Sequence, residues 1–323
     1  MNAHIRKAYG ILEGMVADRA LIENLSLIQG DDILDLVSLA HRVKERYAPP
    51  FHACAIMSVK TGSCSEDCRF CSQSAHHSCR IDEFPLVDTE RILERAREAY
   101  AAGVTSFGIV TGGSGYLKKG EEFSRILDAI DEVRKAFPDK GVCACLGHLT
   151  EETAAALAAR GIASYNLNLQ TSPLRYAELV ATTHTVNDRI ATILLLKKHG
   201  IPICCGGIIG IGEAMADRVD LAFTLRDIGA DIIPLNVLIP IPGTPLEART
   251  PPTAAEVAVT FAIFRLVNPA ATIKFAAGRE TVMRDFQGLI MTMANGFITG
   301  GYLTTRGRSY EDDIALAREL ECF

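Results

Sequence analysis

Short apolar runs along the chain alternate with longer stretches in which apolar residues recur every three or four positions. Side chains alternate across a strand but return to one face of a helix every 3.6 residues, so these two patterns predict strands and amphipathic helices. Candidate strands are at 54–59, 105–110, 142–146, 164–169, 203–208, 232–238, 271–275 and 296–299. Candidate helices between them are at 88–101, 121–136, 151–160, 187–199, 213–228 and 252–266.

This alternation also predicts the fold class. Strands that alternate with helices form α/β folds with a parallel sheet, and eight such strands favour a (β/α)8 TIM-type barrel over an open sheet. Residues 1–50 have the pattern of two or three amphipathic helices. We therefore expect an N-terminal helical extension at 1–50, and at 51–323 a barrel that ends with a C-terminal helix. Such barrels keep their chemistry at the C-terminal ends of the strands.

Composition narrows the class of protein. The 323 residues are 48% apolar, which is enough for a large core, and the net charge of −6 comes without a run of Lys or Arg. We therefore expect neither nucleic acid nor a membrane as a partner. The first residues, MNAHIRKAYG, contain no apolar signal region. Ten cysteines without such a signal predict a cytoplasmic protein that uses thiols for metal ligation rather than for disulfides.

Three cysteines carry the clearest chemical pattern. Cys64, Cys68 and Cys71 have C-x3-C-x2-C spacing within GSCSEDCRFCSQS. Thiolates hold iron–sulfur clusters, and three ligands leave one iron of a 4Fe–4S cluster with an open coordination site. The alternative is structural zinc, but closed zinc sites use four ligands, usually as two C-x2-C pairs, and the sequence has no second pair.

This spacing resembles that of the radical S-adenosylmethionine (SAM) superfamily. The resemblance implies that SAM binds the open iron and is split into methionine and a 5′-deoxyadenosyl radical, and that Phe70 lines the adenine. The glycine-rich stretch at 206–213 resembles the element beside the SAM adenosine, with Gly207 and Ile208 as candidate contacts. Gly112 and Gly113 are candidates for the turn that receives the methionyl amine. Alternatively, both glycine segments are only tight connections between elements.

A more specific resemblance covers most of the chain. The strings SVKTGSCSEDCRFCSQS, YNLNLQTSP, CCGGIIGIGE, LNVLIPIPGTPL and FAAGRE occur in this order and resemble the biotin synthase family. The resemblance implies insertion of one sulfur between two unactivated carbons of dethiobiotin. That reaction needs two hydrogen abstractions, hence two SAM molecules, with the sulfur supplied by an auxiliary iron–sulfur cluster inside the barrel. A low-potential electron donor of the flavodoxin or ferredoxin type and a homodimer are further expectations.

The resemblance also implies roles for several polar residues. Asn168 and Asn236 match asparagines that contact SAM or the ureido ring of dethiobiotin, which an amide suits because it offers both donors and acceptors. Alternatively, these asparagines satisfy backbone groups at strand ends. The family string YNHNLDT is altered, with Leu167 and Gln170 in place of its His and Asp, and Gln170 remains a candidate SAM contact. His184 stands where the family often has an arginine near the SAM carboxylate.

The auxiliary cluster is where this sequence departs from the better-known family pattern. That pattern uses three cysteines and an arginine. Cys143 and Cys204 match two of the cysteines, Gly108 stands at the third position, and Lys274 stands at the arginine position. Lys274 is therefore also a candidate substrate contact. A two-iron cluster with two of its four ligands is doubtful here.

Additional cysteines offer a replacement for the missing ligands. Cys143 and Cys145 point to the same face of a strand, whereas Cys204 and the adjacent Cys205 cannot both point inward. We therefore predict a larger auxiliary cluster with an extra sulfide, held by Cys79, Cys143 and Cys204, with Cys145 as a further candidate. This resembles the anaerobe-type branch of the family. Cys54, Cys205 and Cys322 are expected to be small buried hydrophobes.

Two alternative functions stay open at this point. One is another radical SAM barrel enzyme, such as a maturase for an iron hydrogenase, which would keep the chemistry and change the product. The other is a non-catalytic iron–sulfur or zinc protein that senses redox state. The roles of His148 and Arg279 are also open.

Overall fold

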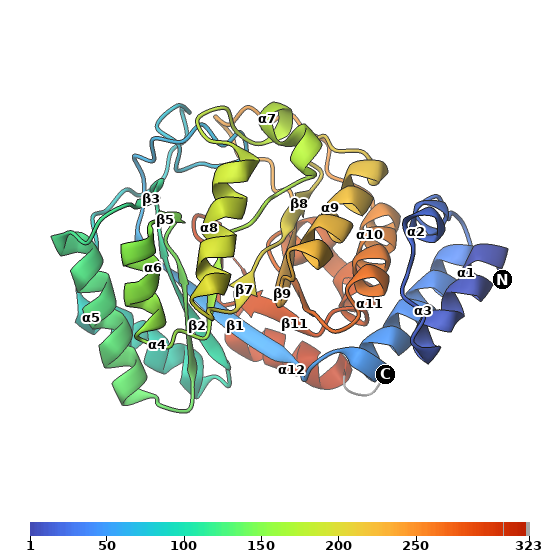
Figure 1. The fold of residues 1–323 in the computed structure, drawn as a ribbon, viewed down its shortest axis with the longest axis horizontal. Helices are drawn as coiled ribbons and strands as arrows, with labels where there is room; N and C mark the ends of the chain where they lie inside the picture. The colour runs from blue at the N-terminus through green and yellow to red at the C-terminus, as the bar shows by residue number, and fades with distance from the viewer. Residues whose placement is uncertain (306, 321–323) are drawn as a thin grey trace.

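The computed structural model describes residues 1–305 and 307–320 as a barrel with helices around it (Figure 1). The sheet strands are β1 (His52–Lys60), β2 (Ser106–Thr111), β4 (Gly141–Cys145), β6 (Ser164–Asn166), β7 (Ile203–Cys204), β8 (Gly207–Ile209), β9 (Ile232–Val237), β10 (Thr272–Phe275) and β11 (Gly296–Thr299). Their order is β10-β11-β1-β2-β4-β6-β7-β9-β8, and β10 also pairs with β9. That last pairing closes the sheet into a ring.

All strand pairs of this sheet are parallel, and β7 and β8 share one position in the ring because both pair with β9. The closed parallel barrel confirms the predicted fold class. The strand expected at 203–208 is divided in two at Cys205 and Gly206. A Cβ atom on Gly206 would lie 1.9 Å from the Pro234 carbonyl oxygen, so β9 approaches the backbone too closely for any side chain there.

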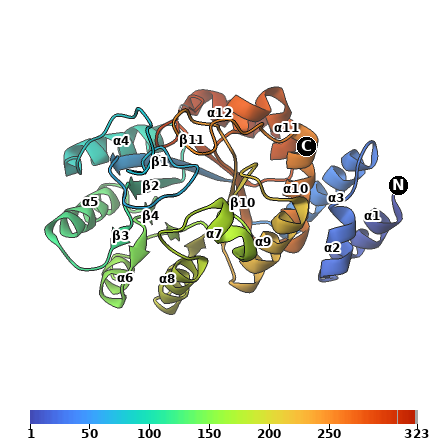
Figure 2. The same ribbon diagram turned by 90° about the horizontal axis from the view of Figure 1, so that it is seen from above.

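Helices form the outer layer of the barrel, as the view from above shows (Figure 2). They are α4 (Thr89–Ala101), α5 (Glu121–Ala136), α6 (Glu151–Ala158), α8 (Val186–Lys198), α9 (Met215–Asp227), α10 (Ala254–Val267), α11 (Gln287–Met291) and α12 (Tyr310–Leu320). Short elements in the connections are β3 (Gly115–Tyr116), β5 (His148–Leu149) and α7 (Tyr176–Leu179). No helix in the described part of the chain is long and apolar enough to cross a membrane.

The N-terminal helices α1 (Ala3–Ala8), α2 (Arg19–Leu25) and α3 (Asp32–Tyr47) lie outside the ring, beside α10 (Figures 1 and 2). Their apolar faces join the core that fills the space between the barrel strands and the outer helices. The helical extension is thus present. The domain boundary at residue 50 stays a prediction.

Strand register decides which side chains face the barrel interior. Ile56 on β1 pairs with Gly108 on β2, and Gly108 pairs with Cys143 on β4. These residues and others two positions away on the same strands line one internal cavity. Because successive side chains of a strand alternate between faces, the intervening residues, such as Phe107 and Val142, pack outward into the core. The interior is therefore supplied by every second residue of each strand.

Candidate active site

A cavity of about 330 Å³ occupies the barrel interior and reaches the loops beyond the C-terminal ends of the strands. Phe70 and Cys71, on the loop after β1, line its mouth, together with residues 302–305. Cys54, Cys143, Cys204 and Lys274 line it deeper in the barrel. One chamber thus joins the three-cysteine loop to a second group of thiols.

The three-cysteine loop has a defined backbone conformation. The Cys64 N–H donates to the Gln73 carbonyl at 3.0 Å, and the Ala75 N–H donates back to the Cys64 carbonyl at 2.8 Å. The Cys71 N–H donates to the Cys68 carbonyl at 2.9 Å, which closes a tight turn around the last two cysteines. None of the three thiols forms a disulfide within residues 1–305 and 307–320. Burial raises the pKa of Cys68 to about 12 and that of Cys71 to about 11.

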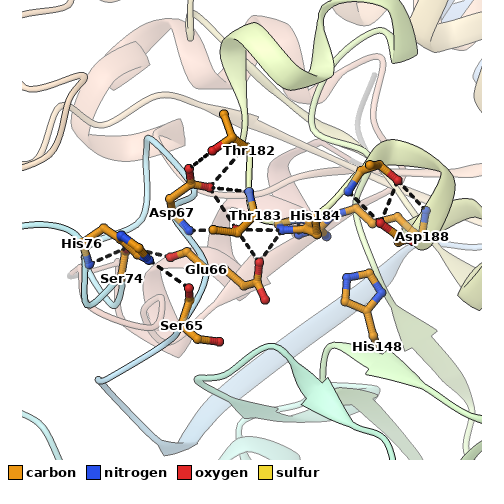
Figure 3. Close-up of polar contacts among 12 residues, drawn as sticks. Ser65, Glu66, Asp67, Ser74, His76, His148, Thr182, Thr183, His184 and Asp188 are labelled. Carbon is orange, nitrogen blue, oxygen red and sulfur yellow. Dashed lines mark hydrogen bonds and ion pairs between the residues drawn. The ribbon is translucent and has the colours of Figure 1, made fainter.

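A network of carboxylates ties this loop to the segment before α8 (Figure 3). Asp67 accepts hydrogen bonds from the Thr182 N–H at 2.8 Å and the Thr183 N–H at 3.2 Å. Burial raises the pKa of Asp67, but the hydrogen bonds from Thr182 and Thr183 outweigh burial and hold it well below its usual range. The neighbouring Glu66 accepts from His184 Nδ1 at 2.6 Å. Two adjacent carboxylates between Cys64 and Cys68 therefore anchor the loop to the segment 182–184.

His184 already uses both ring nitrogens within this network. Its Nδ1 contacts Glu66, and its Nε2 lies 2.8 Å from the Tyr176 hydroxyl and 3.1 Å from Arg189 Nε. Burial, followed by the charge of Arg189, lowers the pKa of His184, so the ring is neutral at pH 7. Arg189 also donates from Nη1 to the Asn168 carbonyl at 2.9 Å. His184 thus positions a guanidinium beside the cysteine loop.

The amide side chains of the cavity wall differ in whether their polar atoms form hydrogen bonds. Asn168 Oδ1 accepts from the Gly206 N–H at 3.0 Å, and Asn236 bridges the Gly207 carbonyl and the Ala277 N–H, both at 3.1 Å. Both asparagines therefore satisfy backbone groups and line the cavity as well. Gln170 differs, because its Oε1 atom is buried and has no hydrogen-bond partner among the described residues. That oxygen is available to a ligand.

The glycines and the isoleucine expected near SAM take separate positions. Ile208 lines the cavity and, like Phe70, packs against the apolar cluster around Ile211. Gly207 lies directly behind Ile208, where a Cβ atom would come within 2.8 Å of the Gln170 carbonyl oxygen. Gly112 donates to the Lys60 carbonyl at 2.8 Å, and a Cβ there would lie 2.4 Å from Gln73 Oε1, so it adjoins the cysteine loop. Gly113 has a φ of 136° and open space beside it.

Strand geometry determines which of the remaining thiols on the strands face the cavity. Cys143, Cys145 and Cys204 line the cavity, whereas Cys205 packs into the outer core, as the alternation of strand side chains requires. Cys79 is not among the cavity-lining residues. It lies outside the barrel on the loop after β1, where burial, followed by the charge of Glu247, raises its pKa. Cys322 lies outside the described residues.

Two side chains of β6, Ser164 and Asn166, make polar contacts with the inner thiols. Ser164 Oγ donates to Cys143 Sγ at 3.1 Å. Asn166 Nδ2 donates to Cys204 Sγ at 3.3 Å, and Cys145 Sγ donates to Asn166 Oδ1 at 3.3 Å. A hydrogen bond with the Cys54 thiol is the main cause that lowers the pKa of Cys143.

Whether these thiols suit iron–sulfur clusters depends on how such clusters are held. Within residues 1–305 and 307–320, no three His, Cys, Asp or Glu side chains converge on a point where a single metal ion would bind. The thiolates of a cluster instead ligate different iron atoms, so they need only surround a common space. Three free thiols on one loop, and further thiols facing one cavity, meet that requirement.

Comparison with known proteins identifies the family. Residues 58–225 match the Radical SAM superfamily model, and residues 234–322 match the Biotin and Thiamin Synthesis associated domain. Biotin synthase of Chlorobium limicola is 54% identical over 321 residues, which cover 98% of this chain and 96% of that protein. Biotin synthase of Chlorobaculum tepidum is 52% identical over 328 residues, which cover 100% and 98%. The chain belongs to the biotin synthase family.

Membership confirms the resemblance drawn from the sequence motifs and the class of enzyme, a radical SAM sulfurtransferase of biotin synthesis. Radical SAM chemistry implies a 4Fe–4S cluster, SAM and a source of electrons.

Solved structures support the fold. The structure of methylornithine synthase has a TM-score of 0.83 at 17% identity, and the match covers 98% of this chain and 95% of that protein. The FeFe-hydrogenase maturase of Carboxydothermus hydrogenoformans has a TM-score of 0.79 at 16% identity and covers 98% and 78%. At such low identity these structures show the fold alone.

Two residues that belong to the candidate site were not identified from the sequence. The first is Arg189, which could have been noticed because it lies in the first turn of α8, shortly after His184. Cys54 is the other, since we expected it to be a small hydrophobe and it faces the cavity. The alternation of side chains along β1 could have revealed it. Cys54 lies two residues before Ile56 and so shares its face, and Ile56 pairs with Gly108.

Proposed function

We propose that this chain inserts sulfur into dethiobiotin to form biotin, with a radical generated at the mouth of the cavity and sulfur held deeper in the barrel. One observation carries the proposal: the three-cysteine loop and a separate group of buried thiols line the same cavity. A substrate between them would meet the radical source on one side and the sulfur source on the other.

The residues at the mouth would hold the first cluster and SAM. Cys64, Cys68 and Cys71 would ligate three irons and leave the fourth to SAM. When bound, the cluster and SAM supply a 5′-deoxyadenosyl radical, which can abstract hydrogen from an unactivated carbon where acid–base groups cannot. The hydrogen bonds of Asp67 and Glu66 to the segment 182–184 would keep this loop fixed over the cavity.

Several residues at the mouth have the chemistry that SAM needs. Phe70 and Ile208 are apolar lining residues that suit an adenine ring. The unpartnered Gln170 Oε1 would accept a hydrogen bond from a ribose hydroxyl. Arg189, held in place by His184, would pair with the SAM carboxylate, because a guanidinium matches a carboxylate with two parallel hydrogen bonds.

The glycine segments would receive the rest of SAM. Gly112 and Gly113 adjoin the cysteine loop and would accept the methionyl amine through their backbone. Gly207 has no side chain, so β8 can pack closely against the Gln170 backbone. This close packing would let the Ile208 backbone approach the adenosine.

Deeper in the cavity, we assign the substrate contacts to Asn168, Asn236 and Lys274. The two amides would meet the donors and acceptors of the ureido ring without adding charge. Lys274 is buried and cationic, so it would stabilise negative charge at this end of the chamber.

The sulfur source in this proposal is an auxiliary iron–sulfur cluster larger than 2Fe–2S, with an extra sulfide as the inserted atom. Cys143 and Cys204 are its supported ligands, because both face the cavity from neighbouring parts of the ring. Cys145 also faces the cavity, whereas Cys79 would have to reach it from the loop outside. Gly108 would leave space for the larger cluster.

We also propose a cytoplasmic homodimer that takes electrons from a flavodoxin or ferredoxin type of donor. Val16, Leu27 and Leu34 in the N-terminal segment are large, exposed apolar side chains, which supports this segment as the dimer interface.

The experiment is an anaerobic reaction of the reconstituted protein with SAM, a low-potential reductant and dethiobiotin, followed by mass spectrometry. We expect biotin with about two 5′-deoxyadenosines per product, because each hydrogen abstraction consumes one SAM. Deoxyadenosine without biotin would overturn the substrate. If protein with intact clusters formed neither biotin nor 5′-deoxyadenosine, the proposal would be overturned. As a control, Cys68→Ala should abolish both products.

A further inference from the structure

Cys54 occupies the cavity wall beside the proposed auxiliary ligands. It lies on β1 and is 6% exposed, close to the 8% of Cys143 and the 9% of Cys204. All three line the same cavity. A thiol that served only as a small hydrophobe would face the outer core, as Cys205 does.

The contacts of Cys54 bring it to the auxiliary site. Its thiol donates to the Ala55 carbonyl at 3.6 Å and faces the same cavity as the thiols of Cys143 and Cys204. The register explains this proximity. Strand β2 lies between β1 and β4, Cys54 pairs with Ser106, and Cys143 pairs with Gly108 two residues further along β2. Since Gly108 carries no side chain, thiols from the two flanking strands meet above its backbone.

The same glycine explains why the ligand stands on β1 rather than on β2. A Cβ atom on Gly108 would lie 3.1 Å from Ile56 Cγ2, so the cavity wall is crowded at this point. A cysteine on β2 would compete with Ile56 for space. A cysteine two residues before Ile56, on β1, faces the same cavity without that conflict.

Lys274 provides an independent sign of an anionic group. It is 3% exposed and lines the cavity, and within the described residues its ammonium group has neither a hydrogen bond nor an ion pair. It lines this cavity together with Cys54, Cys143 and Cys204. A buried cation without a partner is costly, and a cluster held by three thiolates would supply the missing negative charge.

We propose that Cys54, Cys143 and Cys204 together ligate the auxiliary cluster, with Cys54 replacing the thiol that is absent at Gly108 and Lys274 balancing the charge. This inference rests on the proposed function, because it assigns a ligand of the cluster named there. It also assigns Cys79 to the loop outside the barrel, and it leaves Cys145 to its hydrogen bond with Asn166.

The test isolates the auxiliary cluster. In a parent variant with Cys64, Cys68 and Cys71 changed to alanine, only the inner thiols can hold iron and sulfide. After anaerobic reconstitution, iron, acid-labile sulfide and the Mössbauer spectrum are measured for each chain. The parent should retain one cluster, and adding Cys54→Ala should remove about half or more of its iron, because loss of a ligand weakens the site. Adding Cys205→Ala, a buried cysteine that faces away, or Cys79→Ala should leave the iron content unchanged.

The outcomes separate the two proposals. Unchanged iron and an unchanged spectrum in the Cys54→Ala variant would overturn the role of Cys54 while the auxiliary cluster stands. A parent variant that binds no iron would overturn the auxiliary cluster itself, and the role of Cys54 with it. Cys54→Ser nearly preserves the side-chain volume and guards against misfolding, which thermal unfolding of the apo-protein would monitor. A loss of iron or a changed spectrum in that folded variant supports ligation, whereas a spectrum like that of the parent contradicts it.

Discussion

Gln170 combines two features that rarely serve stability. Its φ is 71°, in the left-handed region that non-glycine residues seldom adopt, and its buried Oε1 atom lacks a hydrogen-bond partner in the part of the chain that the structure describes. Its backbone is held in this conformation by Gly206 and Ile208, with hydrogen bonds of 3.0 Å and 2.9 Å. Strain and an unsatisfied buried acceptor at one residue are typical of a ligand contact.

The substitution Gln170→Leu should therefore separate binding from stability. Removal of an unsatisfied buried acceptor should leave the free energy of unfolding of the apo-protein within about 0.5 kcal/mol, or raise it. SAM affinity should fall about tenfold, which is about 1.4 kcal/mol. Isothermal titration calorimetry and urea unfolding measure the two quantities.

The control for this prediction is Gln287→Leu, because Gln287 is also buried but its Oε1 accepts from Arg279 at 2.8 Å. It should lose stability and keep its SAM affinity. Equal SAM affinity in the Gln170→Leu variant and the unmodified protein would show that this amide does not contact SAM.

At the scale of elements, the contacts between the cysteine loop and the start of α8 join segments that are far apart in the sequence. Glu66 and His184 are 118 residues apart, and the His148 ring lies 5.5 Å from the His184 ring (Figure 3). Burial, followed by the charge of Arg189, lowers the pKa of both histidines. Their protonation would place three positive charges, counting Arg189, in one buried cluster.

This network predicts a loss of stability in mild acid. Because the folded-state pKa of His184 lies below the unfolded value of about 6.5, its neutral form stabilises the fold above that pH, and this contribution is lost as the pH falls below about 6.5. The free energy of unfolding of the apo-protein should fall more between pH 7.5 and pH 5.5 than that of His184→Gln, which has similar hydrogen-bonding groups but does not titrate. Parallel pH profiles for the two proteins would contradict this assignment.

At the scale of the whole molecule, α12 is fastened to the barrel by one buried ion pair. Arg279 donates to Asp313 through Nη1 at 2.9 Å and Nη2 at 2.8 Å, and both side chains are fully buried. The role of Arg279, open from the sequence, is thus to hold the last helix. Residues 302–305, which line the cavity mouth, precede α12 in the chain.

Asp313→Ala should therefore destabilise the protein by about 3–5 kcal/mol, because it leaves the Arg279 guanidinium buried without its counter-charge. Urea unfolding of the apo-protein measures the change. Asp312→Ala alters the exposed neighbouring carboxylate and should change the free energy of unfolding by less than about 0.5 kcal/mol. A similar small effect at Asp313 would mean that α12 is held mainly by its apolar contacts.

The barrel could be predicted from sequence because each strand and helix has its own local period. The strand at 296–299 has the bounds predicted for it, and parity alone separated Cys204 from Cys205. Contacts across the ring were beyond such reasoning. Arg189, Glu66 and Cys54 gain their roles only when distant segments meet. Family positions also directed attention to β2, β4 and β7, so a thiol on β1 was assigned to the core.

The bare backbone at Gly108 has a consequence for how this kind of site changes over time. In a closed barrel, alternate strands present side chains in the same layer, so a ligand lost from one strand can be regained from a nearby strand that faces the same space, without moving the cavity. Two substitutions, each confined to a single strand, would suffice. Equivalent clusters in related barrels can therefore be held by different strands. A sequence alignment that compares matching positions would then miss a ligand that a comparison of the layers inside the barrels would find.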